Sequence, residues 1–184
     1  MHELALHVLD LVQNSLEAQA TSVWLEVSEN TAADLLTIRV MDNGRGMDKQ
    51  AAANATDPFS TSRTTRKVGL GLPLMDMTAR QADGYLTIDS KPGKGTIVEA
   101  VYRLSHWDRP PLGNMADTVR TIIVANPELD FHYSHSVGQT VFSVSTQELK
   151  EILGEIPLTH PDVLVWLESY LKENTANLYG GVQE

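Results

Sequence analysis

A carboxylate and two glycines stand close together in the segment "MDNGRGM", residues 41–47. Asp42 follows the apolar-rich run "LLTIRV", and at the end of a strand its carboxylate could accept a hydrogen bond from an amino group. Gly44 and Gly46 permit positive φ and allow a ligand to approach the backbone closely. A flat heterocycle with an exocyclic amine would fit such a site.

The same segment also has a purely structural interpretation. Asn-Gly after a strand-like run is the strongest short-range signal for a two-residue hairpin turn, which requires a second strand next. The residues that follow, "DKQAAANA", are rich in alanine, favour a helix and show no alternation of period two. The hairpin interpretation is therefore disfavoured.

A second stretch, "DPFSTSRTTRKVGLGLPLM", combines bases, hydroxyls and glycines. Arg63, Arg66 and Lys67 stand among five Ser or Thr hydroxyls, and Gly69 and Gly71 follow at the start of a predicted helix. Backbone amides at a glycine-rich helix N-terminus attract anions, and nearby Arg or Lys adds charge-assisted hydrogen bonds. These groups are suited to binding phosphate. The spacing fits neither G-x-G-x-x-G nor G-x-x-x-x-G-K-[ST], so both standard phosphate-binding folds are disfavoured.

The first predicted helix places five polar residues at spacings of three and four, and so on one stripe: Glu3, His7, Asp10, Asn14 and Glu17. Such a stripe is what any half-buried helix produces, so a solvated face is the default interpretation. His7 is accordingly expected on the helix surface. His132 and His135, three apart on a predicted strand, are expected on opposite faces, so a shared metal is disfavoured.

Hydrophobic periodicity and turn signals define the elements that must position these groups. Helices are predicted over 3–18, 48–55, 70–82, 112–126, 146–154 and 160–174, a loop over 56–68, strands over 22–29 and 34–41, a hairpin over 84–103, and a second hairpin from 129–137 and 140–145. This order predicts helices packed on one face of a mixed sheet. "SHWDRPPLGN" interrupts every periodicity, and its prolines predict a boundary near residue 105.

Taken in order, "LVQNSLEA", "MDNGRGM", "DPFSTSR", "GLGLPLM" and "SKPGKGTIVEA" resemble the ATP-binding site of the GHKL superfamily. That superfamily groups gyrase-type topoisomerases, heat-shock chaperone ATPases, histidine kinases and MutL-type mismatch-repair ATPases. The resemblance covers residues 1 to about 104. It implies an α+β fold, a two-layer α/β sandwich of the Bergerat type, with ATP and Mg²⁺ as cofactors. Residues 105–184, to which the resemblance does not extend, are expected to form a small, acidic α/β appendage.

The resemblance also implies roles for single residues. Asn14 is similar to the asparagine that holds Mg²⁺ against the phosphates, and Asp42 to the aspartate that bonds the adenine amino group. The other implied nucleotide-binding residues are Gly44, Gly46, Met47 and Thr96 around the adenine, Arg63, Arg66 and Lys67 in a lid over the phosphates, and Gly69, Leu70 and Gly71 in a second glycine turn.

Asp10 is the candidate catalytic residue. It lies four residues before Asn14, one turn earlier on the same helix face. Hydrolysing relatives usually have glutamate there and histidine kinases often have asparagine, so aspartate departs from both patterns. Its side chain could still accept a proton or orient water, but it is one methylene shorter than glutamate. Binding of ATP is therefore expected more firmly than its hydrolysis.

Two branches of the superfamily compete. "LVQNSLEAQATSV" is similar to the mismatch-repair version of the first motif, whereas the short lid, "GLGLPL" and "GKGT" are similar to histidine kinase catalytic domains. The kinase branch matches in three segments and is favoured, although the phosphoacceptor hairpin of a complete sensor kinase is not expected here. The chain would then pass the γ-phosphoryl group to a partner protein or hydrolyse ATP slowly.

Two other functions stay open from the sequence. In the first, the chain is a non-catalytic, ATP-dependent switch that binds a protein, of the anti-sigma or MutL-like regulatory kind. In the second, the chain is wholly structural and its glycines serve turns alone.

Composition narrows the partners. The chain has 184 residues, 42% of them apolar, enough for a real core, and no cysteine for disulfides or thiolate metal sites. Its net charge of −10 is concentrated in residues 105–184, which carry 4 basic and 11 acidic side chains. Such a surface repels nucleic acid and anionic lipid, and no apolar run approaches the roughly 20 residues of a membrane span. We expect a cytoplasmic protein with an adenine nucleotide and an unidentified protein as partners, without nucleic acid or membrane, and with a homodimer left open.

Overall fold

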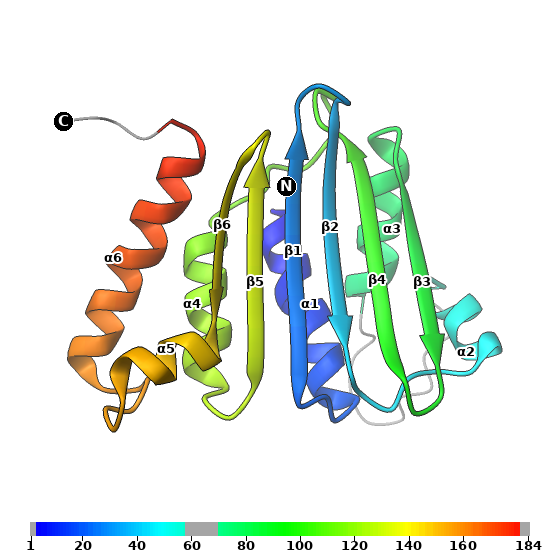
Figure 1. The fold of residues 1–184 in the computed structure, drawn as a ribbon. Coiled ribbons are helices and arrows are strands. Elements are labelled where there is room, and N and C mark those ends of the chain that lie inside the picture. Colours follow the sequence, from blue (N-terminus) through cyan, green and yellow to red (C-terminus); the bar gives the residue numbers. More distant parts are fainter. Residues whose placement is uncertain (1–2, 58–69, 181–184) are drawn as a thin grey trace.

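The protein is a single six-stranded sheet with helices packed against it, as the computed structural model describes for residues 3–57 and 70–180 (Figure 1). The strand order is β3-β4-β2-β1-β5-β6. The helices are α1 (Leu4–Glu17), α2 (Lys49–Asn54), α3 (Gly71–Gln81), α4 (Met115–Ala125), α5 (Thr146–Leu153) and α6 (Pro161–Leu178). The strands are β1 (Ser22–Asn30), β2 (Leu35–Asp42), β3 (Tyr85–Lys91), β4 (Gly95–Arg103), β5 (Asp130–Val137) and β6 (Thr140–Ser145).

These elements confirm the order predicted from periodicity, and the layered α/β fold is confirmed with them. The last helix is the main difference in length, because it continues to Leu178 instead of ending near residue 174. Most of the predicted loop over 56–68 lies outside the described residues. None of the helices in the described ranges has the length and apolar character needed to cross a membrane.

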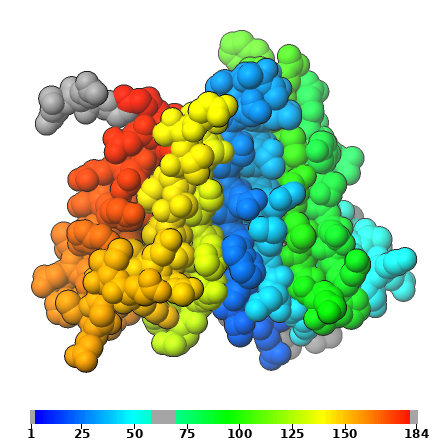
Figure 2. All heavy atoms as spheres, in the orientation of Figure 1, coloured from blue at the N-terminus to red at the C-terminus, as the bar shows by residue number. Residues whose placement is uncertain are grey.

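The sheet buries one face and leaves the other open, as the two-residue period of its strands requires. In β1 the buried side chains are Val23, Leu25 and Val27, and the residues between them, Trp24 and Glu26, point to the opposite face. Helices α1, α3 and α4 lie behind the sheet in Figure 1. Figure 2 looks onto the open face, where strand atoms form the surface and α5 stands at the lower left.

Helix α1 packs between the sheet, α3 and α4, and this placement corrects one expectation. His7 was predicted on the helix surface, but its side chain is buried, with 4% of its area exposed. A helix that contacts neighbours on several sides buries a wider arc than one apolar stripe. The polar stripe of α1 is therefore narrower than its sequence spacing indicates.

Residues 105–184 extend the same sheet. Strand β5 pairs in parallel with β1, with Ser22 opposite Asp130, and β6 then pairs antiparallel with β5. One hydrophobic core includes residues from both segments, such as Leu25 and Phe131. The boundary between two units near residue 105 stays a prediction, and the segments on either side of it share one sheet and one core.

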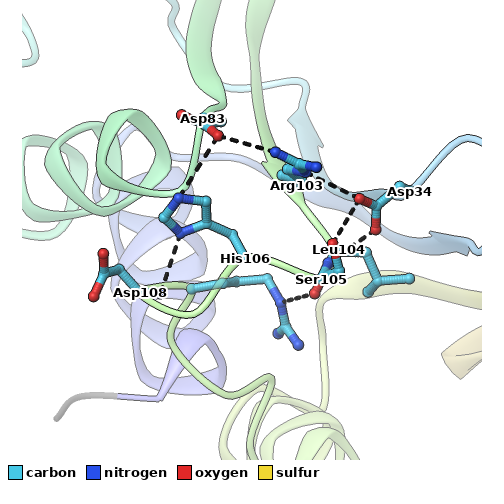
Figure 3. A network of polar contacts seen from close by, with 8 residues as sticks. Asp34, Asp83, Arg103, Leu104, Ser105, His106 and Asp108 are labelled. Atoms are coloured by element: carbon cyan, nitrogen blue, oxygen red, sulfur yellow. Dashed lines mark hydrogen bonds and ion pairs between the residues drawn. The ribbon is translucent and has the colours of Figure 1, made fainter.

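A polar network fastens the connector that leaves β4 (Figure 3). Arg103 bridges Asp34, at 3.1 Å, and Asp83, at 3.4 Å. Ser105 adds its backbone N–H and its hydroxyl, which donate to Asp34 at 2.9 and 2.7 Å. His106 contacts Asp83 at 3.6 Å. These contacts hold the start of the second segment against the turns that precede β2 and β3.

Candidate functional site

The carboxylate of Asp42, the last residue of β2, is held from two sides. The hydroxyl of Ser15 on α1 donates to Oδ2 at 2.7 Å, and the backbone N–H of Gly44 donates to Oδ1 at 2.9 Å. Ser15 is buried, with 3% of its area exposed. Each carboxylate oxygen can accept more than one hydrogen bond, so both retain capacity for a further donor.

A cavity of about 670 Å³ opens beside this carboxylate, between α1, the end of β2, the start of β4, and α2. Its size lies within the range of small-molecule sites, roughly 300 to 1,000 Å³. Five of the residues predicted from the sequence line it: Asn14, Asp42, Gly46, Met47 and Thr96. Asp42 and Thr96 meet there because they are directly opposite in the antiparallel pairing of β2 with β4.

The two glycines after Asp42 fit tightly into their surroundings. A Cβ atom on Gly44 would lie 2.8 Å from the carbonyl oxygen of Ala18. Gly46 has φ of +67°, and its Cβ would lie 2.0 Å from the carbonyl oxygen of Lys91. The loop between them is fixed to α1 by the N–H of Arg45, which donates to Ala18 at 2.8 Å. Both glycines are needed to seat this loop against its neighbours.

A hydroxyl network supports the far wall of the cavity. The backbone N–H of Met47 donates to Ser90 Oγ at 2.8 Å, and Ser90 Oγ lies 2.9 Å from Thr96 Oγ1. Ser90 also donates to the carbonyl of Gly95 at 3.1 Å. Because the Ser90 hydrogen is used in this bond, Thr96 donates to Ser90. The hydroxyl oxygen of Thr96 can then still accept a hydrogen bond.

Asn14 and Asp10 occupy successive turns of α1, but only Asn14 lines the cavity. Asp10 is exposed and faces the start of α3, where a Cβ atom on Gly71 would lie 2.7 Å from the Asp10 Cβ and 3.2 Å from its Oδ2. Gly71 therefore allows α3 to approach α1. Leu70 is 44% exposed and, like Gly71, does not line the cavity, whereas Leu72 does.

Four predicted phosphate-binding residues cannot be placed. Arg63, Arg66, Lys67 and Gly69 lie outside the described residues. Their roles stay predictions.

A metal ion that binds together with phosphate groups needs few protein ligands, and the side chains around the cavity can meet that requirement. Over residues 3–57 and 70–180 the structure brings together no group of three His, Asp or Glu side chains able to hold a metal. Mg²⁺ is usually held by one or two protein oxygens, several waters and the substrate's phosphates. The half-buried amide of Asn14 could supply one such oxygen.

Sequence reasoning missed Ser15, Ser90 and Arg45. Ser15 had a detectable signal, because it lies on the apolar face of α1, three residues after Val12, where a hydroxyl needs a partner. Arg45 lies between Gly44 and Gly46 in the sequence and lines the cavity. Its position inside the glycine motif could have identified it as a site residue. Ser90 had none, since its contact with Met47 depends on the tertiary fold.

Comparison with known proteins gives matches over different lengths. Residues 2–106 match the family described as histidine kinase-, DNA gyrase B-, and HSP90-like ATPase. The sensor protein kinase FleS of Pseudomonas aeruginosa is 39% identical over 97 residues, which cover 53% of this chain and 24% of the relative. The DNA mismatch repair protein MutL of Lacticaseibacillus paracasei is 29% identical over 187 aligned positions, covering 81% of this chain and 28% of the relative.

A solved structure supports the fold over a longer range. The crystal structure of the N terminal domain of a DNA repair protein superposes with a TM-score of 0.56 and 14% identity, covering 99% of this chain and 58% of that chain. The MutL alignment, at 81% of this chain, likewise reaches beyond residue 106. This chain spans less than a third of either curated relative, 24% of FleS and 28% of MutL.

Proposed function

The chain belongs to the family of histidine kinase-, DNA gyrase B- and HSP90-like ATPases, and on that premise we propose that it binds Mg-ATP in the cavity beside α1. One observation carries the proposal. Asp42 lines that cavity with its carboxylate oriented by Ser15 and Gly44, while both of its oxygens keep acceptor capacity.

The roles of the residues follow from their chemistry. An ionised carboxylate is acceptor-only, so Asp42 would accept a hydrogen bond from the 6-amino group of adenine and reject the 6-oxo group of guanine. Thr96, opposite Asp42, would present its hydroxyl oxygen to the same base. Asn14 would contribute an oxygen to the Mg²⁺ that accompanies the phosphates. The bases Arg63, Arg66 and Lys67 would neutralise phosphate charge.

We further propose that the bound ATP is used for phosphoryl transfer to a partner protein or for slow hydrolysis. The similarity to the sensor protein kinase FleS supports this use. In phosphoryl transfer, positioning and charge neutralisation supply most of the catalysis. Asp10 lies one turn before Asn14 and is exposed, so it could orient the attacking water or hydroxyl and accept its proton.

A second candidate function is a nucleotide-dependent switch without turnover, active in the cytoplasm on a protein partner. It is favoured by the position of Asp10, which lies outside the cavity lining and against Gly71. It is favoured too by the MutL similarity, which extends into the second segment. ATP would then act as a ligand that shifts the population of binding states.

Calorimetric titration with ATP and ADP, each with and without Mg²⁺, tests the first proposal. We expect saturable binding in the micromolar to millimolar range, strengthened by Mg²⁺ for ATP. Absence of heat with either nucleotide up to millimolar concentration would falsify it.

Product analysis of the same mixtures separates the two uses of ATP. If ATP is turned over, Asp10→Asn should slow ADP formation and leave ATP affinity unchanged. If the wild-type protein forms no more ADP than Asp10→Asn, and no candidate partner is labelled from γ-labelled ATP, the switch is the better description.

A further inference from the structure

The open face of the sheet carries a groove of about 410 Å³ where β1, β5 and β6 meet α5. Its aromatic wall is formed by Trp24 and His132, whose rings are stacked with centroids 5.4 Å apart and an angle of 7° between planes. Both side chains are half-buried, so each ring is fixed by its neighbours and still accessible. In Figure 2 α5 stands beside this part of the face.

Three carboxylates line the groove, those of Glu26, Glu148 and Glu151, and no Lys or Arg is among its lining residues. Glu26 contacts Arg39 at 3.6 Å, and both side chains are nearly half exposed. Glu148 accepts the N–H of Ser145 at 3.1 Å, in the capping box at the start of α5. Glu151, also exposed, accepts a 3.4 Å contact from the side-chain amide of Gln147.

We propose that this groove docks an arginine-bearing segment of a basic partner protein. A guanidinium group stacks on aromatic rings and bonds carboxylates through parallel N–H donors, and the groove is lined by two aromatic rings and by carboxylates. The net charge of −10, with 4 basic and 11 acidic residues in 105–184, would steer a basic protein towards this end of the molecule. A second copy of the chain would bring like charge to the same surface.

The groove adjoins the cavity region without sharing its chemistry. Trp24 also lines a neighbouring depression that reaches Met41, Asp42 and Thr96 at the strand ends. The docking surface therefore lies next to the site proposed for ATP. It is distinct from that site, because Trp24 and the three carboxylates are not among the residues that line the cavity beside α1.

The test uses the full chain without nucleotide and a fluorescein-labelled peptide, Gly-Ser-Arg repeated three times. A peptide with citrulline in place of arginine keeps the shape and removes the charge. We compare Glu151→Gln and Trp24→Ala with Glu173→Gln, a matched loss of one exposed carboxylate on α6 outside the groove. Circular dichroism and thermal unfolding verify that each variant is folded.

Arginine-dependent binding that weakens about fivefold in Glu151→Gln supports the proposal, since one partly exposed charge pair contributes up to about 1 kcal/mol. Glu173→Gln should remain within roughly twofold of the wild type, and added salt should weaken binding. In a chain with Trp107→Phe and Trp166→Phe, the peptide should change the fluorescence of Trp24, the remaining tryptophan.

Three results would overturn the assignment. Equal losses of peptide affinity in Glu151→Gln and Glu173→Gln would mean that the peptide is attracted by the overall negative charge and not by the groove. Equal affinity for the citrulline peptide would exclude guanidinium recognition. If sedimentation shows a wild-type dimer that dissociates in Glu151→Lys, and the wild-type protein does not bind the peptide, this face would be assigned to a second copy of the chain. Because ATP is left out, failure here leaves the proposed nucleotide site untouched.

Discussion

Strand β2 carries an aspartate at each end, and the two differ in what surrounds them. Asp34, just before the strand, accepts hydrogen bonds from Ser105 and Arg103, with Oδ2 serving both side chains and Oδ1 the backbone N–H of Ser105. These bonds hold the pKa of the Asp34 carboxyl below its ordinary value. Asp42, at the other end, has one donor on each oxygen and faces a cavity.

The contrast extends to the rest of the sheet. Near the Asp34 end, buried His135 contacts Tyr133 Oη through Nδ1 and Glu29 Oε1 through Nε2, both at 3.0 Å. The hydroxyl of Tyr179, after α6, donates to the same Glu29 oxygen. Polar groups at this end satisfy one another, whereas at the other end acceptors are oriented and left available. Residue type alone does not separate a structural carboxylate from a binding one; remaining acceptor capacity beside a cavity does.

Replacing the two aspartates should give opposite phenotypes, and the largest effect is expected at Asp42. Asp42→Asn puts an amide N–H₂ where adenine and Gly44 both present donors. We expect about a 100-fold loss of ADP affinity, or roughly 2.7 kcal/mol, by calorimetry. Asp34→Asn should lower Tm and leave ADP affinity unchanged. Equal affinity losses in both variants would remove the distinction between the two ends.

The next largest effect is expected at the structural end. His135→Leu fills a similar volume with an apolar side chain. It removes the partner of the buried Tyr133 hydroxyl and one of the hydrogen-bond donors to Glu29. We expect about 2 kcal/mol of lost stability in urea unfolding, with ADP affinity unchanged. His132→Leu, on the same strand but half exposed, is the control and should lose less. A large effect of His135→Leu on ADP affinity would show that the two ends are coupled.

The features that depend on local sequence signals could be predicted from the sequence. Helices and strands follow from periodicity and turn residues, and the resemblance of ordered motifs indicated that Asn14, Asp42 and Thr96 belong together, which they do around the cavity. Long-range packing was not accessible. The parallel pairing of β1 with β5 has no local signal, and His7 is buried because α3 and α4 flank α1.

Ser15 sharpens the comparison at the binding end, with a smaller effect than Asp42. Ser15→Ala removes the 2.7 Å donor that orients Oδ2 and leaves the carboxylate in place. We expect about a tenfold loss of ADP affinity, near 1.4 kcal/mol, and a reduced preference for adenine over guanine nucleotides. Ser22→Ala removes a similar serine–aspartate contact, to Asp130 at 3.3 Å, away from the cavity, and should bind ADP normally. Unchanged affinity in Ser15→Ala would show that the Gly44 N–H alone orients the carboxylate.

The smallest effect is expected from Tyr179→Phe and depends on pH. Burial is the largest influence on the pKa of Glu29 and raises it, yet the hydrogen bonds from His135 and Tyr179 bring the pKa below its ordinary value. A carboxyl with a lowered pKa in the folded state stabilises the fold above its unfolded pKa, about 4.3, and loses that contribution as the pH falls through the folded value. Removing the Tyr179 hydroxyl should raise the folded pKa of Glu29 towards the unfolded one. Urea unfolding should therefore show a deficit of about 1 kcal/mol or less at pH 7 that shrinks as the pH falls below 4.3. A deficit that stays constant with pH would mean that the contribution of the Tyr179 hydroxyl is not linked to the ionisation of Glu29.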